Sequence, residues 1–479
     1  MERICKTSIK IDRNRDRREA LFGFQSKLDF LGKDLTGGKR DHFSVIVVLG
    51  FQVQQHGKLE RSTGSRGGYL VHVFLVLNQF SQGKNHNKQY TANGASCKVG
   101  ATGFRAARFP FIIPRAGISL TGIMEKPDIP LDAKTAEQAE MFANRLRKRL
   151  RHLGKWARRR GTGAFRLYDR DIPEIPLVLD LYADDLRGSL ASGALYKRPY
   201  EKDDSQEALW LDAMRVAAAG ALGIGKDGVI IKLRQRQQGQ AQYEKVSGQG
   251  LTREVREGGL KFRVNLSDYL DTGLFLDRRV MRNMVRADSR GKRVLNLFCY
   301  TASFSVYAAS GGAVSTDSVD LSNTYIAWGR ENLALNGFDA EILKREEYFD
   351  RDRTAADGTH RLIRADVSAF LRDARSAGIR WDSIVVDPPA FSNSTMARGD
   401  FDLQRDFMDL LNSATALLAP VGRIWFSANA RSFRGSAGEL ETALARKFPN
   451  IRVTDISDRT VDEDFRGRKT PKAFLLDRP

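Results

Sequence analysis

Apolar residues recur at helical spacing between Asp132 and Arg160, where they include Met141, Phe142, Leu146, Leu150, Leu153, Trp156 and Ala157. These separations, mostly three or four residues, place the side chains on one stripe, which predicts an amphipathic helix. The remaining faces carry nine basic residues with no acid among them, namely Arg145, Arg147, Lys148, Arg149, Arg151, Lys155, Arg158, Arg159 and Arg160. These cations could lie along a phosphate backbone. A solvated helix face is the alternative interpretation.

An alternating pattern replaces the helical one at residues 229–236. A strand here would place Lys232, Arg234 and Arg236 on one face and the aliphatic residues on the other. A basic strand close to a basic helix indicates a surface for RNA. Glycines then mark a series of turns, and we expect a domain boundary near residue 255.

From about Gly291 onward, short buried strands alternate with helices. The strands at 293–298, 314–319, 361–364 and 382–386 and the helices at 301–310 and 323–336 form this repeat. Such a repeat predicts an α/β fold, a Rossmann-like domain with a mostly parallel, doubly wound sheet, preceded by a smaller α+β RNA-binding domain. Asp320, Asp366 and Asp387 each follow a strand, and the carboxyl ends of parallel strands form the ligand crevice of such sheets.

Asp320 lies at the end of the second strand, where a carboxylate can accept hydrogen bonds from both ribose hydroxyls of a nucleoside. A helix N-cap is the alternative role for this residue. The preceding turn, residues 296–304, lacks the glycine fingerprint that cradles a pyrophosphate. The sequence therefore favours a nucleoside cofactor without phosphates.

The segment Trp381–Ser394 contains the sequence Asp387-Pro388-Pro389-Ala-Phe391 directly after a strand. Two prolines stiffen the loop and remove two amide donors. A rigid loop of this kind could hold a planar base, with Asp387 accepting hydrogen bonds from the base edge and Phe391 stacking on its face. The alternative is an ordinary turn that ends in proline.

The charge is unevenly distributed along the 479 residues, which carry 78 Lys and Arg against 58 Asp and Glu, a formal net charge of +20. This excess indicates a polyanionic partner. Residues 1–123 alone hold 20 Lys and Arg against 8 Asp and Glu. We predict that they form a basic, mostly disordered extension that attracts RNA, or an upstream extension outside the working protein, which would then start at Met124.

Three cysteines, Cys5, Cys97 and Cys299, have neither metal-ligand nor disulfide spacing. We therefore expect no metal site and a reducing, cytoplasmic setting. The apolar stretches fall well short of the roughly 20 residues that span a bilayer, so we expect no membrane partner and no obligate protein partner.

Taken together, these motifs resemble the RNA branch of the class I S-adenosylmethionine-dependent methyltransferases, and most closely the guanine-N7 module of bacterial large-subunit (23S) ribosomal RNA methyltransferases. The resemblance runs from about Met141 to Pro479. It is carried by Phe142–Lys148, Leu153–Trp156, Arg166–Asp169, Asn265–Arg278, Asn296–Thr301, Asp387–Ser394, Phe401–Asp406 and Phe426–Asn429. In the fused bacterial enzyme a guanine-N2 methyltransferase half precedes this module, and nothing in residues 1–123 resembles that half.

The resemblance implies S-adenosylmethionine as cofactor and assigns residues to its parts. Asn296, Tyr300 and Thr301 would border the methionine part, Asp320 the ribose and Asp366 the adenine amine. The preceding segment would close the cofactor pocket through Tyr269, Thr272, Gly273, Phe275, Asp277 and Arg278. The family usually has glycine where this chain has Ala302, and a methyl group there could crowd the cofactor if the backbone requires a positive φ.

The resemblance further implies methylation of a guanine N7 in large-subunit ribosomal RNA, by base extrusion and in-line transfer without a covalent intermediate. Expected RNA contacts are Arg145, Lys148, Arg149, Lys155, Lys232, Arg234, Arg236 and Asn393. Methylation at exocyclic guanine N2 or adenine N6 is an alternative, as is an inactive RNA-binding or ribosome-assembly factor. Cytosine-C5 chemistry is disfavoured because it needs a cysteine nucleophile, and no cysteine follows Cys299. We expect the RNA-binding domain at 124–255 and the methyltransferase domain at 256–479.

Overall fold

The computed structural model describes residues 2–11, 45–46, 53–54, 69–78, 131–184, 188–196, 203–234, 250–350, 358–392, 400–429 and 433–478. The chain divides into two compact units, Met1–Ala107 and Arg108–Pro479. Each unit is described by itself.

The first unit contains a small antiparallel sheet in which β4 (Tyr69–Asn78) pairs with β1 (Glu2–Ile11), β2 (Val45–Ile46) and β3 (Val53–Gln54). The predicted extension, residues 1–123, thus includes these four strands. Its assignment as an extension outside the working protein remains a prediction.

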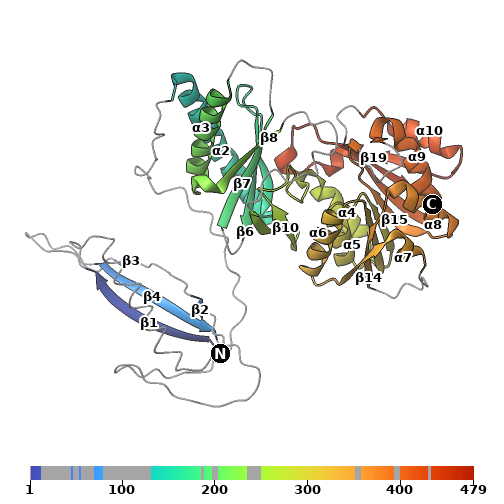
Figure 1. Ribbon diagram of the computed structural model, residues 1–479, viewed down its shortest axis with the longest axis horizontal. Helices are drawn as coiled ribbons and strands as arrows, with labels where there is room; N and C mark the ends of the chain where they lie inside the picture. Colours follow the sequence, from blue (N-terminus) through green and yellow to red (C-terminus); the bar gives the residue numbers. More distant parts are fainter. Residues whose placement is uncertain are drawn as a thin grey trace, which may run out of the picture. The chain divides into compact units, whose positions relative to one another are not determined.

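The second unit begins with a four-stranded sheet in the order β5-β6-β7-β8. Its strands are β5 (Ala164–Asp169), β6 (Leu177–Asp184), β7 (Gly188–Tyr196) and β8 (Val229–Arg234), and its helices are α2 (Ala133–Arg160) and α3 (Asp204–Leu222). A core that includes Phe142, Leu146, Leu153 and Trp210 joins both helices to the sheet (Figure 1). The helix predicted from residue 132 to 160 is confirmed, and Asp132 caps it by accepting the Thr135 N–H at 2.9 Å.

A hairpin of β9 (Thr252–Glu257) and β10 (Leu260–Asn265) links this sheet to the rest of the unit. One continuous core contains Tyr182 from β6, Phe262 from β10 and Tyr307 from helix α5 (Ser303–Ser310). The boundary expected near residue 255 falls inside β9, where Val255 is fully buried in that core.

Buried charges also tie these elements together. Glu257 is fully buried and pairs with Arg282 at 2.5 Å and with Arg279 at 3.1 Å, both from helix α4 (Arg279–Asp288). Arg279 also pairs with Asp464 at 3.0 Å and donates to the Ala164 carbonyl of β5 at 2.7 Å. Because every charge has a partner, the network is compatible with its burial.

The main sheet has eight strands in the order β13-β14-β12-β11-β15-β18-β20-β19. The strands are β11 (Arg293–Leu297), β12 (Ser315–Asp320), β13 (Ala340–Lys344), β14 (Thr359–Arg364), β15 (Trp381–Val386), β18 (Leu418–Ala428), β19 (Arg452–Asp455) and β20 (Lys472–Asp477). All neighbouring pairs are parallel except those of β20, which runs antiparallel to β18 and β19. The predicted Rossmann-like sheet is thus confirmed.

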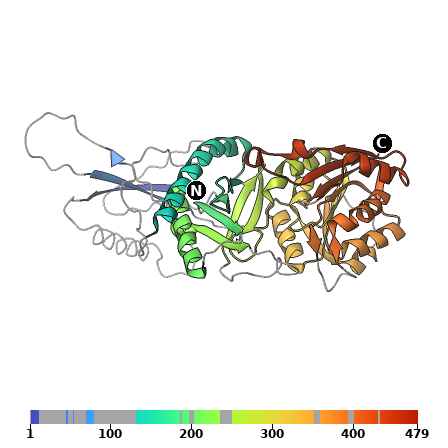
Figure 2. The same ribbon diagram turned by 90° about the horizontal axis from the view of Figure 1, so that it is seen from above.

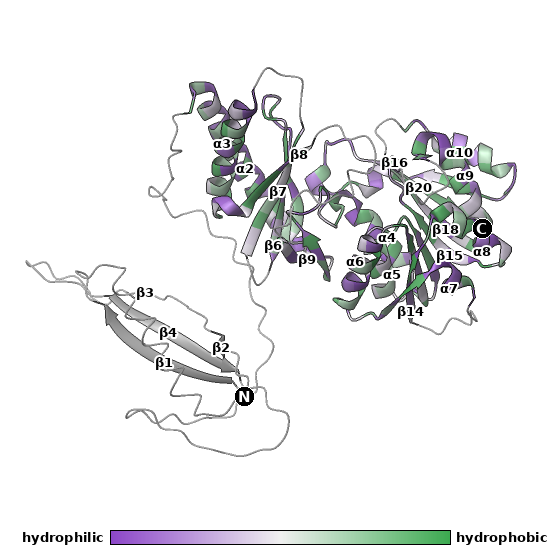
Figure 3. Cartoon of the chain, in the orientation of Figure 1, coloured by the Kyte–Doolittle hydropathy of each residue, from purple (hydrophilic) through white to green (hydrophobic). Residues whose placement is uncertain are grey.

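Alternating side chains bury both faces of this sheet, with helices on each side (Figure 2). Leu295 and Ile384 face a core with α8 (Val367–Ser376), α9 (Leu403–Ala416) and α10 (Ala437–Ala445), whereas Val294 and Val385 face α4 and α5. Figure 3 shows hydrophobic residues concentrated on the strands, while the helices also carry hydrophilic residues. The remaining elements are α6 (Asn323–Ala334), α7 (Arg345–Phe349), β16 (Phe391–Ser392), β17 (Phe401–Asp402) and the short 3-10 helices Lys226–Gly228, Leu276–Arg278, Ser457–Thr460 and Glu463–Phe465.

Candidate active site

A cleft of about 1420 Å³ lies along the carboxyl ends of the central strands. Asp320 at the end of β12, Asp366 after β14 and Asp387 after β15 all line it. The sheet order changes direction between β11 and β15, which is where ligands bind in sheets of this type. The prediction that the three strand-end acids meet at one edge is confirmed.

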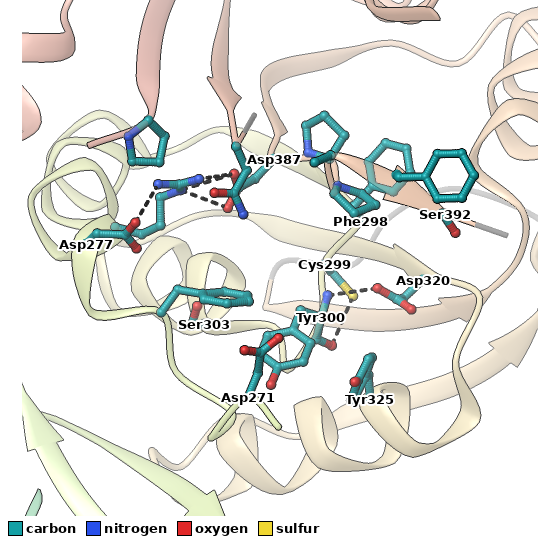
Figure 4. A pocket seen from close by; sticks show the side chains of 18 of the residues that line it. Asp271, Asp277, Phe298, Cys299, Tyr300, Ser303, Asp320, Tyr325, Asp387 and Ser392 are labelled. Atoms are coloured by element: carbon teal, nitrogen blue, oxygen red, sulfur yellow. Dashed lines mark hydrogen bonds and ion pairs between the residues drawn. The ribbon is translucent and has the colours of Figure 1, made fainter. Parts of the chain in front are cut away.

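Asp387 is held by an arginine from a distant part of the chain (Figure 4). Arg278 Nε lies 3.1 Å from both oxygens of the Asp387 carboxylate, and Arg278 Nη2 lies 3.0 Å from Oδ1. Arg278 also contacts Asp277 at 3.2 Å, and its side chain is only 5% exposed. Burial acts to lower the pKa of Arg278, but the charges of Asp387 and Asp277 outweigh it and raise that pKa. The pair therefore fixes a charged carboxylate at the edge of the cleft.

The proline loop continues from Asp387 along the cleft wall, where Pro388 and Pro389 both line the cavity. Phe391 follows on β16 and is 40% exposed, unusual for a large apolar side chain. Pairing of Phe391 with Asp402 on β17 returns the loop to the body of the protein. A stiff loop that presents an exposed aromatic ring to a cavity can stack a planar ligand.

Asp320 is bound only by backbone amides among the contacts that the structure describes. Its Oδ2 accepts the Tyr300 N–H and its Oδ1 accepts the Ser322 N–H, both at 2.9 Å. Burial raises the pKa of Asp320 to about 6, although these amides act to lower it. The N-cap of α6 is Ser322, so Asp320 does not cap that helix as the alternative supposed. Asp366 lines the cleft and also caps α8, accepting the Ala369 N–H at 2.8 Å.

The loop that supplies the Tyr300 amide contains three non-glycine residues with positive φ. Phe298, Tyr300 and Ala302 have φ of 55°, 51° and 58°. Ala302 therefore has the positive φ on which the expected crowding of the cofactor was conditional, but its methyl group is fully buried and does not line the cleft. A methyl group added at Gly329 on α6 would lie 3.0 Å from the Ala302 Cβ, so the two residues face each other. Gly329 makes room for Ala302, and the cofactor side stays clear.

Four residues that the resemblance assigns to the cofactor pocket, Asn296, Thr301, Tyr269 and Gly273, are absent from the cleft lining. Asn296 is 1% exposed and donates to the Ser305 hydroxyl, and Thr301 is fully buried and donates to the Gly273 carbonyl at 2.6 Å. Tyr269 packs its ring 6.0 Å from that of Trp328. Their contacts shape the loops around the cleft, because short polar side chains in tight turns bond to neighbouring backbone and hydroxyl groups.

The segment before α4 does reach the cleft. Thr272 lies 2.8 Å from the Tyr182 hydroxyl, and Phe275 packs 5.0 Å from the Tyr300 ring. Gly273 has a φ of 97°, and an added Cβ would lie 2.3 Å from the Trp328 ring. Glycine at this position therefore permits the close approach of this segment to α6.

The basic face of α2 is divided between paired and exposed cations. Arg145 pairs with Asp171 at 2.6 Å, and Arg149 donates to the Leu167 carbonyl at 3.3 Å. Lys148 and Lys155 are exposed. Half of the four expected RNA contacts on this helix thus also anchor it to neighbouring segments.

The prediction that Lys232 lies on an exposed basic face of β8 is wrong. This residue is 9% exposed and donates to the Tyr269 carbonyl, while its neighbour Leu233 is 50% exposed. The loop that contains Tyr269 covers Lys232 on the side that the alternation assigned to RNA. The Arg234 side chain and residues Arg236 and Asn393 lie outside the described part of the chain.

Several residues that line the cleft were not predicted from the sequence. They are Asp271, Phe298, Cys299, Ser303 and Tyr325 (Figure 4). All five lie within a few residues of a predicted site residue, so listing the complete turns after β11 and β12 would have found most of them. Burial raises the pKa of the Cys299 thiol well above its ordinary value, which makes it a poor nucleophile.

The fold and the cleft define a class of protein: an α/β enzyme that binds a nucleoside at the switch point of a doubly wound sheet. The sequence profile of the S-adenosylmethionine-dependent methyltransferases matches residues 166–458. The chain belongs to this family.

Curated relatives include the ribosomal RNA large subunit methyltransferases K/L of Pseudomonas putida (strain F1) and Stutzerimonas stutzeri (strain A1501). They are 45% and 47% identical over 73% and 70% of this chain. The matches cover 43% and 41% of those proteins, so the chain spans less than half the length of the relatives.

Among solved structures, a SAM-dependent methyltransferase from Streptococcus mutans has a TM-score of 0.52 at 24% identity, covering 73% of this chain and 83% of that one. A methyltransferase complexed with SAH gives a TM-score of 0.51, with the same identity and coverage. These likenesses support the fold. Within the described residues, no helix combines the length and apolarity required to cross a bilayer.

The residues of the cleft fit the cofactor of the family, S-adenosylmethionine. A buried carboxylate whose pKa is raised to about 6 gains from hydroxyl donors, and Asp320 could receive them from a ribose. The rings of Phe275, Tyr300 and Tyr325 form an apolar side of the same cleft, with Tyr300 and Tyr325 4.5 Å apart. Asp366 supplies a further acceptor.

Proposed function

We propose that this protein methylates N7 of a guanine in large-subunit (23S) ribosomal RNA, using S-adenosylmethionine. The observation that carries the proposal is the placement of charged Asp387 and exposed Phe391 on a single stiff loop. That loop lines the same cleft as Asp320 and Asp366. The names of the K/L relatives support ribosomal RNA as the substrate.

The chemistry requires positioning more than proton transfer. Bound S-adenosylmethionine supplies an electrophilic methyl group, and guanine N7 has a free lone pair. Because N7 carries no proton, no general base is needed, and the chain contributes mainly by aligning the reacting atoms. The guanine ring gains positive charge, which the Asp387 carboxylate would favour electrostatically.

Asp387 can bind the base while Arg278 holds it. A carboxylate offers about four acceptor positions, and the Arg278 contacts engage Oδ1 twice and Oδ2 once. The remaining capacity on Oδ2 can accept a hydrogen from N1 or N2 of guanine. Arg278 therefore acts as a positioning residue that orients this carboxylate.

Phe391 would stack on the face of the extruded base. Replacing it with alanine should cost about 1–3 kcal/mol of RNA binding, whereas Phe391→Tyr should bind normally because it keeps the ring. Fluorescence anisotropy with labelled RNA measures both variants. Greater loss in the tyrosine variant than in the alanine variant would contradict stacking.

The RNA must be opened for this reaction. In an A-form helix, N7 faces a deep and narrow major groove that side chains cannot enter, so the base has to leave the stack. Exposed Lys148 and Lys155 on α2 are candidates for holding the opened strand.

Mass spectrometry of the modified base tests the proposal. Unmodified large-subunit ribosomal RNA is incubated with the full chain and isotope-labelled S-adenosylmethionine, then digested to nucleosides. We expect labelled 7-methylguanosine. Labelled N2-methylguanosine or N6-methyladenosine would instead support the alternatives, and absence of both label and cofactor binding would support an inactive RNA-binding factor. The burial of the Ala302 methyl group away from the cleft removes the steric argument for that last alternative.

A further inference from the structure

Three arginines from two distant parts of the chain converge on one carboxylate beside the cleft. Arg145 on α2 pairs with Asp171 Oδ2 at 2.6 Å, and Arg468, between the Glu463–Phe465 turn and β20, pairs with Asp171 Oδ1. Arg149 lies one helical turn after Arg145 and interacts electrostatically with Asp171, Arg145 and Arg468. We call Arg145, Arg149 and Arg468 the arginine cluster.

The arginine cluster carries more positive charge than its surroundings neutralise. Asp171 can balance one of the three charges. The Asp464 carboxylate is taken up by Arg279, and it is the main-chain oxygen of Asp464 that accepts from Arg149, at 3.4 Å. Glu463 binds His152 at 2.8 Å and Arg466 at 3.2 Å. About two positive charges therefore remain in a partly buried place.

The electrostatic effect is visible on Arg149. Burial lowers the pKa of its guanidinium, and repulsion by Arg468 and Arg145 lowers it further against the attraction of Asp171 and Asp464. The Arg145 side chain is 36% exposed and bonds through Nε, leaving Nη1 and Nη2 without a partner within the described part of the chain. An anion with oxygens on several sides would relieve the repulsion and use these donors.

A tight turn connects the arginine cluster to the cleft. Arg468 donates to the Asp169 carbonyl, and Arg170, between Asp169 and Asp171, has a φ of 53°. Positive φ is costly for a long side chain. The Arg170 guanidinium lies over the Tyr196 ring, 5.1 Å from the ring centre. Both residues line the cleft that contains Asp387.

We propose that the arginine cluster binds a backbone phosphate of the RNA, and that the Arg170–Tyr196 pair stacks a base next to the extruded guanine. The inference rests on the proposed function, and it adds the route by which the strand leaves the cleft. RNA fits both features because every nucleotide supplies both a phosphate and a planar base. The cleft volume also exceeds the range of about 300–1,000 Å³ usual for one small ligand, which leaves room for a neighbouring nucleotide.

The phosphate part is tested by anisotropy with a labelled single-stranded RNA, using the full chain at several salt concentrations. Arg145→Gln should weaken binding about tenfold and reduce the log–log salt slope by about 0.7, the contribution of one phosphate contact on a single strand. Arg145→Lys should retain the slope. The matched control is Arg147→Gln, which removes an equal charge from an exposed position on the same helix. Equal effects of Arg145→Gln and Arg147→Gln on the slope would overturn the phosphate site.

The stacking part is tested in the same assay. Tyr196→Ala should weaken RNA binding about tenfold, leave the salt slope unchanged and leave S-adenosylmethionine affinity unchanged. Tyr196→Phe should bind like the wild type. Normal RNA binding by Tyr196→Ala would overturn the stacking platform.

These readouts separate the inference from the proposed function. RNA binding does not require methyl transfer, so the arginine and tyrosine variants can be judged even when labelled 7-methylguanosine is absent. Conversely, methylation at N7 combined with normal RNA binding by both Arg145→Gln and Tyr196→Ala would leave the proposed function intact and remove the inference.

Discussion

Two strand-end carboxylates in one cleft, Asp387 and Asp320, are held in opposite ways. Asp387 faces a buried guanidinium that contacts both of its oxygens, whereas Asp320 faces backbone amides and no cation among the described contacts. Their positions on the sheet are equivalent, one strand on either side of β11. The two carboxylates differ in the donors that neighbouring segments place against them, a guanidinium for Asp387 and backbone amides for Asp320.

The contrast suggests a division of roles within the site. A carboxylate paired with arginine keeps a fixed orientation, which suits a group proposed to meet a base in one geometry. An acid whose pKa is raised to about 6 by burial favours a ligand that donates hydrogen bonds. The same raised pKa means that Asp320 destabilises the unliganded fold as pH rises from 3.8 to about 6, because the folded state holds the proton more tightly than the unfolded chain.

The largest effect should come from neutralising Asp387. Asp387→Asn keeps the size of the side chain but removes the charge that we propose lies beside the guanine, so methyl transfer should fall on the order of 100-fold or more. The rate of methyl transfer by this variant is measured with labelled S-adenosylmethionine and RNA. Asp409→Asn, which alters another acid of the same cleft, should retain activity. Near-normal turnover by Asp387→Asn, with an unchanged melting temperature, would remove this residue from the site.

Asp320 should give a smaller effect that depends on pH. Hydroxyl donors favour the ionised carboxylate, so cofactor binding should release a proton near pH 5.5 and none near pH 8, and affinity should rise between pH 5 and 7. Calorimetry in two buffers of different ionisation enthalpy measures the proton. Asp320→Asn should bind about tenfold more weakly and without proton release. Proton release that persists in this variant would assign the titration to another group.

The smallest effect concerns the loop that delivers the Tyr300 amide to Asp320. Gly329→Ala would place a methyl group 3.0 Å from both the Ala302 Cβ and the Leu362 Cδ2. We expect a loss of about 1–3 kcal/mol in the free energy of unfolding, measured by urea denaturation. Adding Ala302→Gly should recover part of it, since the residues touch. Gly438→Ala, in a helix with open space around it, is the control and should not destabilise. Independent effects of the two substitutions would refute the contact.

Periodicity and strand-end acids were sufficient to predict much of the architecture. The α2 stripe predicts a helix that matches Ala133–Arg160, and the acids at the carboxyl ends of β12, β14 and β15 meet in one cleft as expected. Both signals are local, because helical spacing and a polar residue that ends a buried run do not depend on distant partners.

The remaining features depend on contacts far apart in sequence. Arg278 and Asp387 are separated by 109 positions, and no local sequence pattern predicts that they pair. Lys232 follows a correct alternation but lies against the Tyr269 carbonyl, because the covering loop comes from later in the chain. Asn296 and Thr301 show that a motif position can bond within the loops beside a cleft without lining it.

The buried network of Glu257, Arg279, Arg282 and Asp464 bears on how this protein could be dissected or recombined. Asp464 also accepts the Arg166 amide of β5 at 3.0 Å, so the network draws on both sheets of the second unit. A fragment that began after β8 would expose paired charges and an apolar surface to water together. We therefore expect the two sheets to unfold together, and an exchange of modules between related proteins would have to carry β5 along with the eight-stranded sheet.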